Sequence, residues 1–208
     1  MQKTQMSKLV KFTQLAVLTA IVVVMSFTPL GYLKIGPLSI ALVIIPVVTG
    51  AIVLGPGAGA FMGLVFGITS FAQCFGMDAF GTTLMGISPF FTFVMCIPTR
   101  VLAGFLCGLI FKGISKALDG KKSAGIAFPV AAVSGPVFNT AFFMASLVLL
   151  FGKTDFIQNM MAQSGAGNFL AFIVALVGVN GLVEIASCLI VASAVSKALM
   201  VANKKMRI

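Results

Sequence analysis

The sequence contains no histidine and no tryptophan, and only four of its 208 residues are acidic. Without histidine, metal sites built on imidazole and acid–base catalysis by imidazole are excluded. Asp78, Asp119 and Asp155 fall in segments that we expect to be loops, and Glu184 is the only carboxylate inside a long apolar run. An active site needs a nucleophile or an acid–base set. We therefore expect no enzyme, no metal site and no cofactor.

Two sequence motifs are also missing. The four cysteines have neither CxxC nor metal-ligand spacing, and we assign them no chemistry. The glycine-rich turn LGPGAG at 54–59 has no lysine or hydroxyl residue after it, so it is not a phosphate-binding loop of the type GxxxxGK[ST]. The chain therefore has no means of hydrolysing ATP by that route.

The sequence is rich in apolar residues instead, which make up 60% of it against 9% charged residues. This composition is typical of a helical integral membrane protein. Six apolar runs follow one another, and a run of about 20 residues crosses a bilayer. The first run is longer than the core of a cleaved signal peptide, so we expect it to be retained. We predict an all-α membrane protein with a single domain over 1–208 and a bundle of six transmembrane helices at about 9–27, 40–54, 58–75, 89–111, 124–151 and 169–199.

The basic residues give the chain a formal charge of +10, and their placement predicts its orientation. Eleven of them precede the first span, follow the fourth or close the chain, and with six spans these three clusters lie on one side of the membrane. Only Lys34 and Lys153 lie on the other side, and excess positive charge marks the cytoplasmic face. We expect both termini to be cytoplasmic and the clusters to contact anionic lipid. Basic stripes interleaved with aromatics are absent, which argues against nucleic-acid binding.

One charge, Arg100, lies near the middle of an apolar run at 89–111. A cation at this depth costs at least about 2.5–3.5 kcal/mol, and such residues commonly mark ligand or ion paths. Pro98 just before it frees a backbone carbonyl and is expected to kink the helix. Phe93 shares a helical face with Arg100. We therefore interpret Arg100 as the floor of a binding site.

Three further polar residues are expected at comparable depth. Asn139 lies near the middle of the fifth span, and Asn180 and Glu184 lie one helical turn apart in the sixth. Two interpretations are open. Arg100 and Glu184 form a structural ion pair, with the asparagines joining helices. Alternatively, Arg100 binds a ligand carboxylate through two hydrogen bonds, and the other residues bind amide and hydroxyl groups.

The connecting segments and the small residues supply the remaining candidates. The Pro- and Gly-rich loop at 28–39 holds Tyr32 and Lys34, and is either a lid over a cavity or a plain connector. The segment at 72–88 is expected to be a second outer loop. Small residues four positions apart let helices approach closely. This spacing occurs in the first span at Ala16 and Ala20, and near the third span at Gly55, Gly59, Gly63 and Gly67.

The order of these features resembles a known family. The alanine step, the outer loop FTPLGYLKIGPLSI, the turn AIVLGPGAGAFMGLVFG and the basic loop after the fourth span are similar to substrate-binding S-components of energy-coupling factor (ECF) vitamin transporters. The resemblance covers nearly the whole chain. It implies that the protein binds a vitamin in a pocket open to the outside of a prokaryotic plasma membrane. It also implies assembly with a transmembrane coupling subunit, docked on Ala16 and Ala20, and with two ATPase subunits.

Within this family, the sequence is most similar to the pantothenate type. Arg100 suits a linear acid, whereas the nearby carboxylate of Glu184 favours a cationic or neutral ligand. Thiamin, a pyrimidine, a pyridoxine-type vitamin and riboflavin therefore remain alternatives. A further alternative is a stand-alone secondary transporter or proton-coupled carrier that uses Arg100 and Glu184 as a relay. Such carriers are usually built from inverted repeats, and we see no internal repeat here. The candidate substrate-binding residues are Arg100, Asn139, Asn180, Glu184, Tyr32, Lys34 and Phe93.

Overall fold

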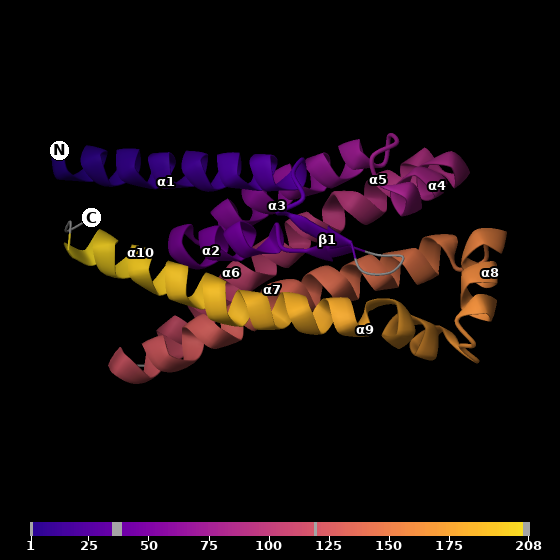
Figure 1. The fold of residues 1–208 in the computed structure, drawn as a ribbon. Helices are drawn as coiled ribbons and strands as arrows, with labels where there is room; N and C mark the ends of the chain where they lie inside the picture. Colours follow the sequence, from indigo (N-terminus) through magenta and orange to yellow (C-terminus); the bar gives the residue numbers. More distant parts are fainter. Residues whose placement is uncertain (1, 35–38, 119, 206–208) are drawn as a thin grey trace.

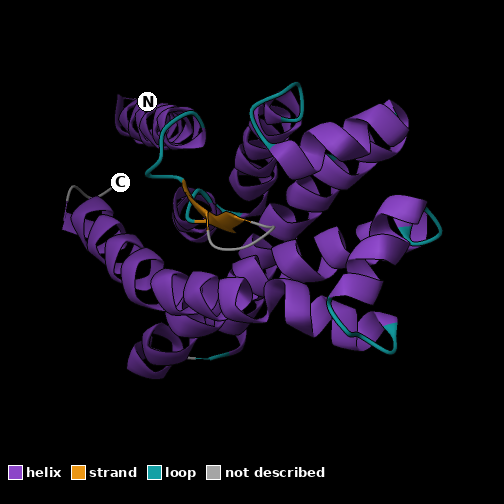
Figure 2. Ribbon diagram, turned by 45° about the vertical axis from the view of Figure 1, so that its right-hand side comes forward, coloured by secondary structure: helices purple, strands orange, loops and turns teal. Residues whose placement is uncertain are grey.

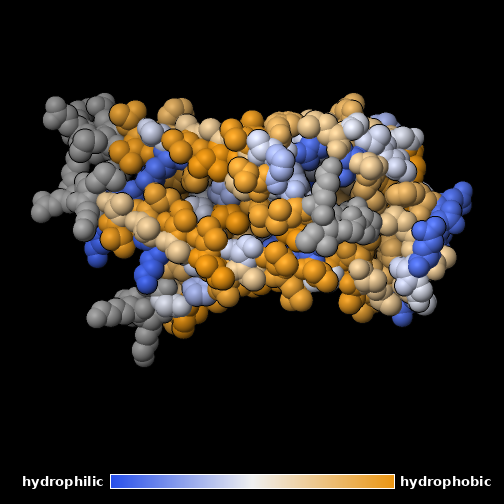
Figure 3. All heavy atoms as spheres, in the orientation of Figure 1, coloured by the Kyte–Doolittle hydropathy of each residue, from blue (hydrophilic) through white to orange (hydrophobic). Residues whose placement is uncertain are grey.

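The computed structural model describes the backbone of residues 2–34, 39–118 and 120–205. The chain forms an elongated bundle of helices, and both labelled termini lie at the same end of it (Figure 1). A small two-stranded hairpin lies within the ring of helices in Figure 2. Apolar residues cover most of the face shown in Figure 3, and hydrophilic residues gather toward its two ends. Such a surface suits a protein surrounded by lipid.

The elements follow the apolar runs of the sequence, with short connections. In chain order they are α1 (Gln2–Ser26), β1 (Tyr32–Lys34), β2 (Ser39–Ala41), α2 (Ile44–Leu54), α3 (Pro56–Gln73), α4 (Ala79–Ile87), α5 (Pro89–Cys96), α6 (Pro98–Ala117), α7 (Gly120–Phe151), α8 (Asp155–Gln163), α9 (Phe169–Ser187), the π-helix η1 (Cys188–Ala192) and α10 (Ser193–Lys205).

The structure confirms an all-α membrane protein. Four helical segments in the described part of the chain are long and apolar enough to cross a membrane: Lys8–Ser26, Pro89–Ala117, Gly125–Phe151 and Phe169–Lys204. They correspond to the first, fourth, fifth and sixth predicted spans. The second predicted span is the shorter apolar helix α2, and the third is α3, which is not among the four.

Two local expectations need correction, and the kink expected at Pro98 is seen as a break between two helices. The predicted span at 40–54 does not begin as a helix, because its first residues form strand β2, which pairs antiparallel with β1. The predicted outer loop at 72–88 contains helix α4, which begins where the Asp78 side chain caps the amide of Gly81. The span at 89–111 is two helices, since α5 ends before Pro98 begins α6.

Helices α3 and α6 pack closely along the predicted glycine ridge. A methyl group added at Gly63 would lie 2.2 Å from the carbonyl oxygen of Arg100, and one at Gly59 would lie 2.3 Å from that of Gly104. Only glycine permits this approach, so the expectation of tight packing is confirmed. Gly55 has a different role, because its φ of 98° forms the turn between α2 and α3. The ridge fixes the start of α6 against α3.

The first and last helices meet near the end that holds the termini. The amide nitrogen Nε2 of Gln14 in α1 donates a hydrogen bond of 2.7 Å to Oδ1 of Asn203 in α10, and Asn203 donates back at 3.3 Å. Elsewhere the described side chains of α1 are largely exposed, and Leu18 and Val22 are its buried apolar contacts with the core among them. Helix α1 is therefore attached along one edge of the bundle.

Candidate functional site

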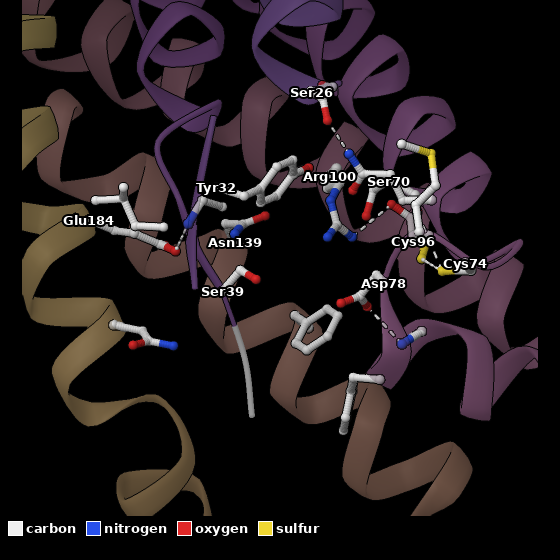
Figure 4. A pocket seen from close by; sticks show the side chains of 18 of the residues that line it. Ser26, Tyr32, Ser39, Ser70, Cys74, Asp78, Cys96, Arg100, Asn139 and Glu184 are labelled. Atoms are coloured by element: carbon white, nitrogen blue, oxygen red, sulfur yellow. Dashed lines mark hydrogen bonds between the residues drawn. The ribbon is translucent and has the colours of Figure 1, made fainter. Parts of the chain in front are cut away.

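The hairpin and the surrounding helices line an open cavity of about 680 Å³. Its wall comes from the end of α1, from both strands, and from α3, α4, α5, α6, α7 and α9. The volume lies within the range of small-molecule sites, roughly 300–1,000 Å³. Figure 4 looks into this cavity and shows polar side chains from several elements directed toward it.

Arg100 reaches the cavity from the first turn of α6. The break before Pro98 leaves the last carbonyl groups of α5 without helical partners. Nη1 of Arg100 donates to the carbonyl oxygen of Cys96 at 3.0 Å and to that of Met95 at 3.4 Å. Because the C-terminal end of a helix carries partial negative charge, this arrangement stabilises the guanidinium. The proline break thus positions the cation.

Two phenylalanine rings offset part of the cost of burying Arg100. Its central carbon Cζ lies 4.7 Å from the ring centre of Phe66 and 5.6 Å from that of Phe143. Such contacts are worth about 0.5–2 kcal/mol, and most where water is excluded. Arg100 is only 8% exposed, and its Nε has no hydrogen-bond partner among the described residues. The guanidinium therefore keeps donor capacity for a molecule in the cavity.

Glu184 binds the hairpin from the other side of the cavity. Its Oε1 accepts a hydrogen bond of 2.7 Å from the backbone amide of Ala41 in β2. Its Oε2 is buried and has no hydrogen-bond partner among the described residues. One oxygen of the carboxylate therefore anchors the hairpin to α9, and the other is available to a ligand.

Arg100 and Glu184 both line the cavity but do not form an ion pair, since no contact of 4.0 Å or less joins them. In Figure 4 they stand on opposite sides of the opening, and Asn139 lies between them in the view. Asn139 comes from α7, and its Oδ1 is buried without a partner among the described residues. Asn180 from α9 is buried and lines the same space. The structural ion pair, one of the two interpretations left open by the sequence, is therefore not the arrangement seen.

Tyr32 brings a hydroxyl group into the cavity from strand β1. The hydroxyl is buried and has no hydrogen-bond partner among the described residues. Burial raises the pKa of Tyr32 to about 12, although the nearby positive charge of Arg100 lowers it in part. The group therefore stays protonated near neutral pH and can donate a hydrogen bond.

The remaining sequence candidates are Phe93, Lys34, Ala16 and Ala20. Phe93 does not line the cavity: it is 42% exposed and packs edge to face on Phe71 at 5.7 Å. Lys34 lies in β1, but its side chain falls outside the described part of the structure. Ala16 and Ala20 are exposed on α1, away from the cavity lining. Hence five of the seven candidate substrate-binding residues line one cavity, and Phe93 does not.

Several cavity residues were not singled out from the sequence. Asp78 caps α4 with a hydrogen bond of 2.7 Å from the Gly81 amide, and it lines the cavity as a second carboxylate. Gln73 at the end of α3 donates to the carbonyl oxygen of Ser26 and joins α3 to α1 beside the cavity. An aspartate just before an apolar stretch is an N-cap signal, so Asp78 and α4 could be found by that rule. No comparable signal exists for Gln73.

The arrangement suits the binding of a small molecule. No group of three or more potential metal ligands occurs among the described residues. The cavity combines a cation, two carboxylates, amides and a hydroxyl with an apolar wall. Buried polar atoms normally have hydrogen-bond partners. The unpartnered atoms of Tyr32, Arg100, Asn139 and Glu184 therefore indicate a site for a small polar molecule.

Comparisons with known proteins agree with this interpretation. The sequence model of the family described as "ECF transporter, substrate-specific component" matches residues 10–196. A relative, the pantothenic acid transporter PanT of Lactococcus lactis subsp. cremoris (strain MG1363), is 31% identical over 153 residues. The matched region covers 67% of this chain and 73% of the relative.

Proposed function

The chain belongs to the family of substrate-specific components of ECF transporters, and from this premise we propose that it captures pantothenate for import. The single observation that carries the proposal is the set of unpartnered polar atoms of Tyr32, Arg100, Asn139 and Glu184 around one cavity. The name of the PanT relative supports pantothenate in particular.

The chemistry of pantothenate matches the distribution of charge in the cavity. This vitamin is a linear acid, with a carboxylate at one end, an amide in the middle, and hydroxyl groups beside two methyl groups at the other end. We place its carboxylate against Arg100, where a guanidinium offers charge-assisted hydrogen bonds. Its amide then faces Asn139, and its hydroxyl groups face Glu184 and Asn180. Tyr32 in the hairpin covers the ligand.

The proposed orientation in the plasma membrane has six spans and two cytoplasmic termini. Figure 1 supports it, since both ends of the described chain and the turn between α6 and α7 lie at the same end of the bundle. Helices α2 and α3 supply the two spans beyond the four long apolar segments. The three basic clusters then all face the cytoplasm. In this orientation, residues 1–208 act as one substrate-binding domain.

The proposed partners are a transmembrane coupling subunit and two ATPase subunits. The chain itself has no phosphate-binding loop, so ATP hydrolysis has to come from elsewhere. Ala16 and Ala20 lie one turn apart and are exposed on α1, where another helix can approach closely. We propose this pair as the docking face for the coupling subunit.

A thermal-shift screen of detergent-purified protein tests the substrate. A ligand at 100 times its dissociation constant adds about 2.7 kcal/mol to the stability of the folded state. We expect pantothenate to raise the unfolding temperature, and thiamin, pyridoxine and riboflavin to leave it unchanged. The shift should disappear in Arg100→Ala. It should remain in the control variant Lys112→Ala, which changes an exposed cation outside the cavity. A shift with another vitamin and none with pantothenate would reject the substrate but keep the family.

One observation favours a second candidate. Asp78 and Glu184 give the cavity two carboxylates against the single guanidinium of Arg100. This balance suits a cationic vitamin such as thiamin better than an acid, unless the anchoring of the hairpin and the capping of α4 occupy both carboxylates. A thermal shift with thiamin that disappears in Asp78→Asn or Glu184→Gln would favour this candidate.

A further inference from the structure

We propose that Cys74 and Cys96 form a redox-active dithiol in the wall of the cavity, which small disulfides convert into an internal disulfide. The two cysteines are 22 positions apart in the sequence, yet their Sγ atoms lie 4.0 Å apart (Figure 4). Both line the cavity, and both are free thiols. Cys107 and Cys188 are also free and buried, but they do not line the cavity.

The positions of the two cysteines allow the sulfur atoms to come together. A disulfide bond is about 2.05 Å long, so the sulfurs have to approach by roughly 2 Å. Cys74 is the C-cap residue directly after α3, and the turn after it contains Gly76, whose φ is 114°. Cys96 is the last residue of α5, just before the break at Pro98. Because both residues stand at helix ends, their backbones can adjust without breaking a continuous helix.

The surroundings of the pair distinguish the two thiols. The thiol of Cys74 donates to the carbonyl oxygen of Ser70 at 3.4 Å. The guanidinium of Arg100 donates to the carbonyl oxygen of Cys96 at 3.0 Å, which places a positive charge beside that residue. The thiolate is the reactive form of cysteine. We assign Cys96, the residue whose backbone contacts Arg100, as the sulfur that attacks first.

The reaction is thiol–disulfide exchange and needs a small disulfide as the oxidant. The Cys96 thiolate attacks one sulfur of that reagent, whose S–S bond breaks, and a mixed disulfide forms as the first small thiol leaves. The sulfur of Cys74 then attacks Cys96, and the second small thiol leaves. The two protons of the protein thiols end on the two released thiols. The protein loses two hydrogen atoms, and the reagent is reduced to two thiols.

The disulfide would change the ligand site, because Cys96 holds Arg100. The carbonyl oxygens of Met95 and Cys96 accept the hydrogen bonds of the guanidinium. Movement of Cys96 toward Cys74 shifts these acceptors and with them the cation. We expect oxidation to weaken binding of a carboxylate ligand tenfold or more, and reduction to restore it. This effect on binding rests on the proposed function, whereas the disulfide itself does not.

The test uses the full chain in detergent, treated with hydroxyethyl disulfide and measured by intact-mass spectrometry. The double variant Cys107→Ser/Cys188→Ser keeps only the cavity pair, and we expect it to lose two hydrogen atoms without keeping an adduct. Cys74→Ser/Cys96→Ser is the matched variant and is expected to form no internal disulfide. Peptide mapping of the wild type should place the bond between Cys74 and Cys96.

Two results would overturn the inference. One is a Cys107→Ser/Cys188→Ser variant that ends as a stable mixed disulfide or does not react. The other is a wild-type disulfide that peptide mapping places between Cys107 and Cys188. The proposed substrate is judged separately: an internal disulfide in a protein that binds no pantothenate supports the dithiol and rejects the substrate. Where pantothenate does bind, saturation with it should slow the oxidation, and an unchanged rate would contradict the position of the pair in the ligand space.

Discussion

The backbone amide of Ala41 donates a hydrogen bond of 2.7 Å to Oε1 of Glu184, and this contact joins the hairpin to α9 across 143 positions of sequence. Ala41 belongs to the hairpin that covers the cavity, and Glu184 is a polar group that lines it. A carboxylate that accepts a backbone N–H in a buried place is a stronger acceptor than an amide. Glu184 therefore has a structural role as well as the proposed role in binding.

The first prediction concerns this contact. Glu184→Ala leaves the buried amide of Ala41 without its acceptor, which costs about 1–3 kcal/mol. We expect a clear fall in the unfolding temperature of the ligand-free protein. Glu184→Gln keeps an acceptor oxygen and should lose less stability. Asp155→Asn, at the start of α8 and outside the cavity, is the control. A Glu184→Ala variant as stable as the wild type would contradict the anchoring role.

The second prediction separates charge from shape at Arg100. Pantothenol has an alcohol where pantothenate has a carboxylate, so it should bind the wild type at least tenfold more weakly, because hydrogen bonds to charged groups are worth about 1.5–3 kcal/mol. Arg100→Ala should bind both compounds weakly and about equally. Arg100→Lys keeps the charge but not the planar guanidinium, so its affinity for pantothenate should lie between those of the wild type and Arg100→Ala. Calorimetric titration measures the four affinities of the cycle for wild type and Arg100→Ala. If Arg100→Ala still prefers pantothenate over pantothenol as strongly as the wild type does, the ligand carboxylate does not bind Arg100.

The third prediction concerns the hydroxyl group of Tyr32. Burial raises its pKa from 10.0 to about 12, so the unfolded chain loses this proton before the folded protein does. The folded state then binds more protons than the unfolded state, and stability falls as pH rises from about 10 to about 12. Tyr32→Phe should remove this part of the fall, and it should also weaken pantothenate binding by about 0.5–1.5 kcal/mol. Unfolding temperatures measured from pH 8 to 12, together with titrations at neutral pH, check both effects. Identical pH profiles for the two proteins would be the contrary result.

The fourth prediction tests the glycine ridge. Gly63→Ala places a methyl group 2.2 Å from the Arg100 carbonyl oxygen, so α3 and α6 have to separate. Overpacking of this kind costs about 1–3 kcal/mol. We expect lower stability and weaker ligand binding, since the start of α6 carries Arg100. Gly113→Ala in α6 meets no atom within 4 Å and should be neutral or stabilising by about 0.5–1 kcal/mol. Equal stability of the two variants would show that the helices can relax at this contact.

The fifth prediction tests the docking face. Ala16→Leu and Ala20→Leu add bulk where another helix is proposed to approach, so copurification with the coupling and ATPase subunits should fall. Vitamin binding by the isolated protein should not change, because neither alanine lines the cavity. Val17→Leu is the control, since Val17 is also exposed but points about 100° away around the helix. Normal assembly of both alanine variants would move the docking face elsewhere.

Much of the fold could be predicted from the sequence, because lipid imposes strong rules on composition. The apolar runs located the helices, and the glycine spacing predicted that the third span packs closely, although not that its partner is α6. The hairpin could not be predicted, since strands of three residues produce no pattern of alternation. Phe93 was placed on the face of Arg100 by helical spacing, but the break before Pro98 interrupts that spacing.

The cavity was predictable in part. Arg100, Asn139, Asn180 and Glu184 were found because polar groups inside apolar runs are costly and therefore conspicuous. Gln73 and Cys74 were not found, since a polar residue or a cysteine at the end of a helix is ordinary in isolation. Their significance comes from contacts with Ser26 and Cys96, which only the three-dimensional arrangement brings near.

The hydrogen bonds between Gln14 and Asn203 have a consequence for biosynthesis. Gln14 is synthesised 189 positions before Asn203. Before Asn203 is synthesised, Gln14 therefore lacks the hydrogen-bond partner that it has in the folded protein. The contact between α1 and α10 therefore cannot form until Asn203 has been synthesised, and a chain cut short before Asn203 would lack it.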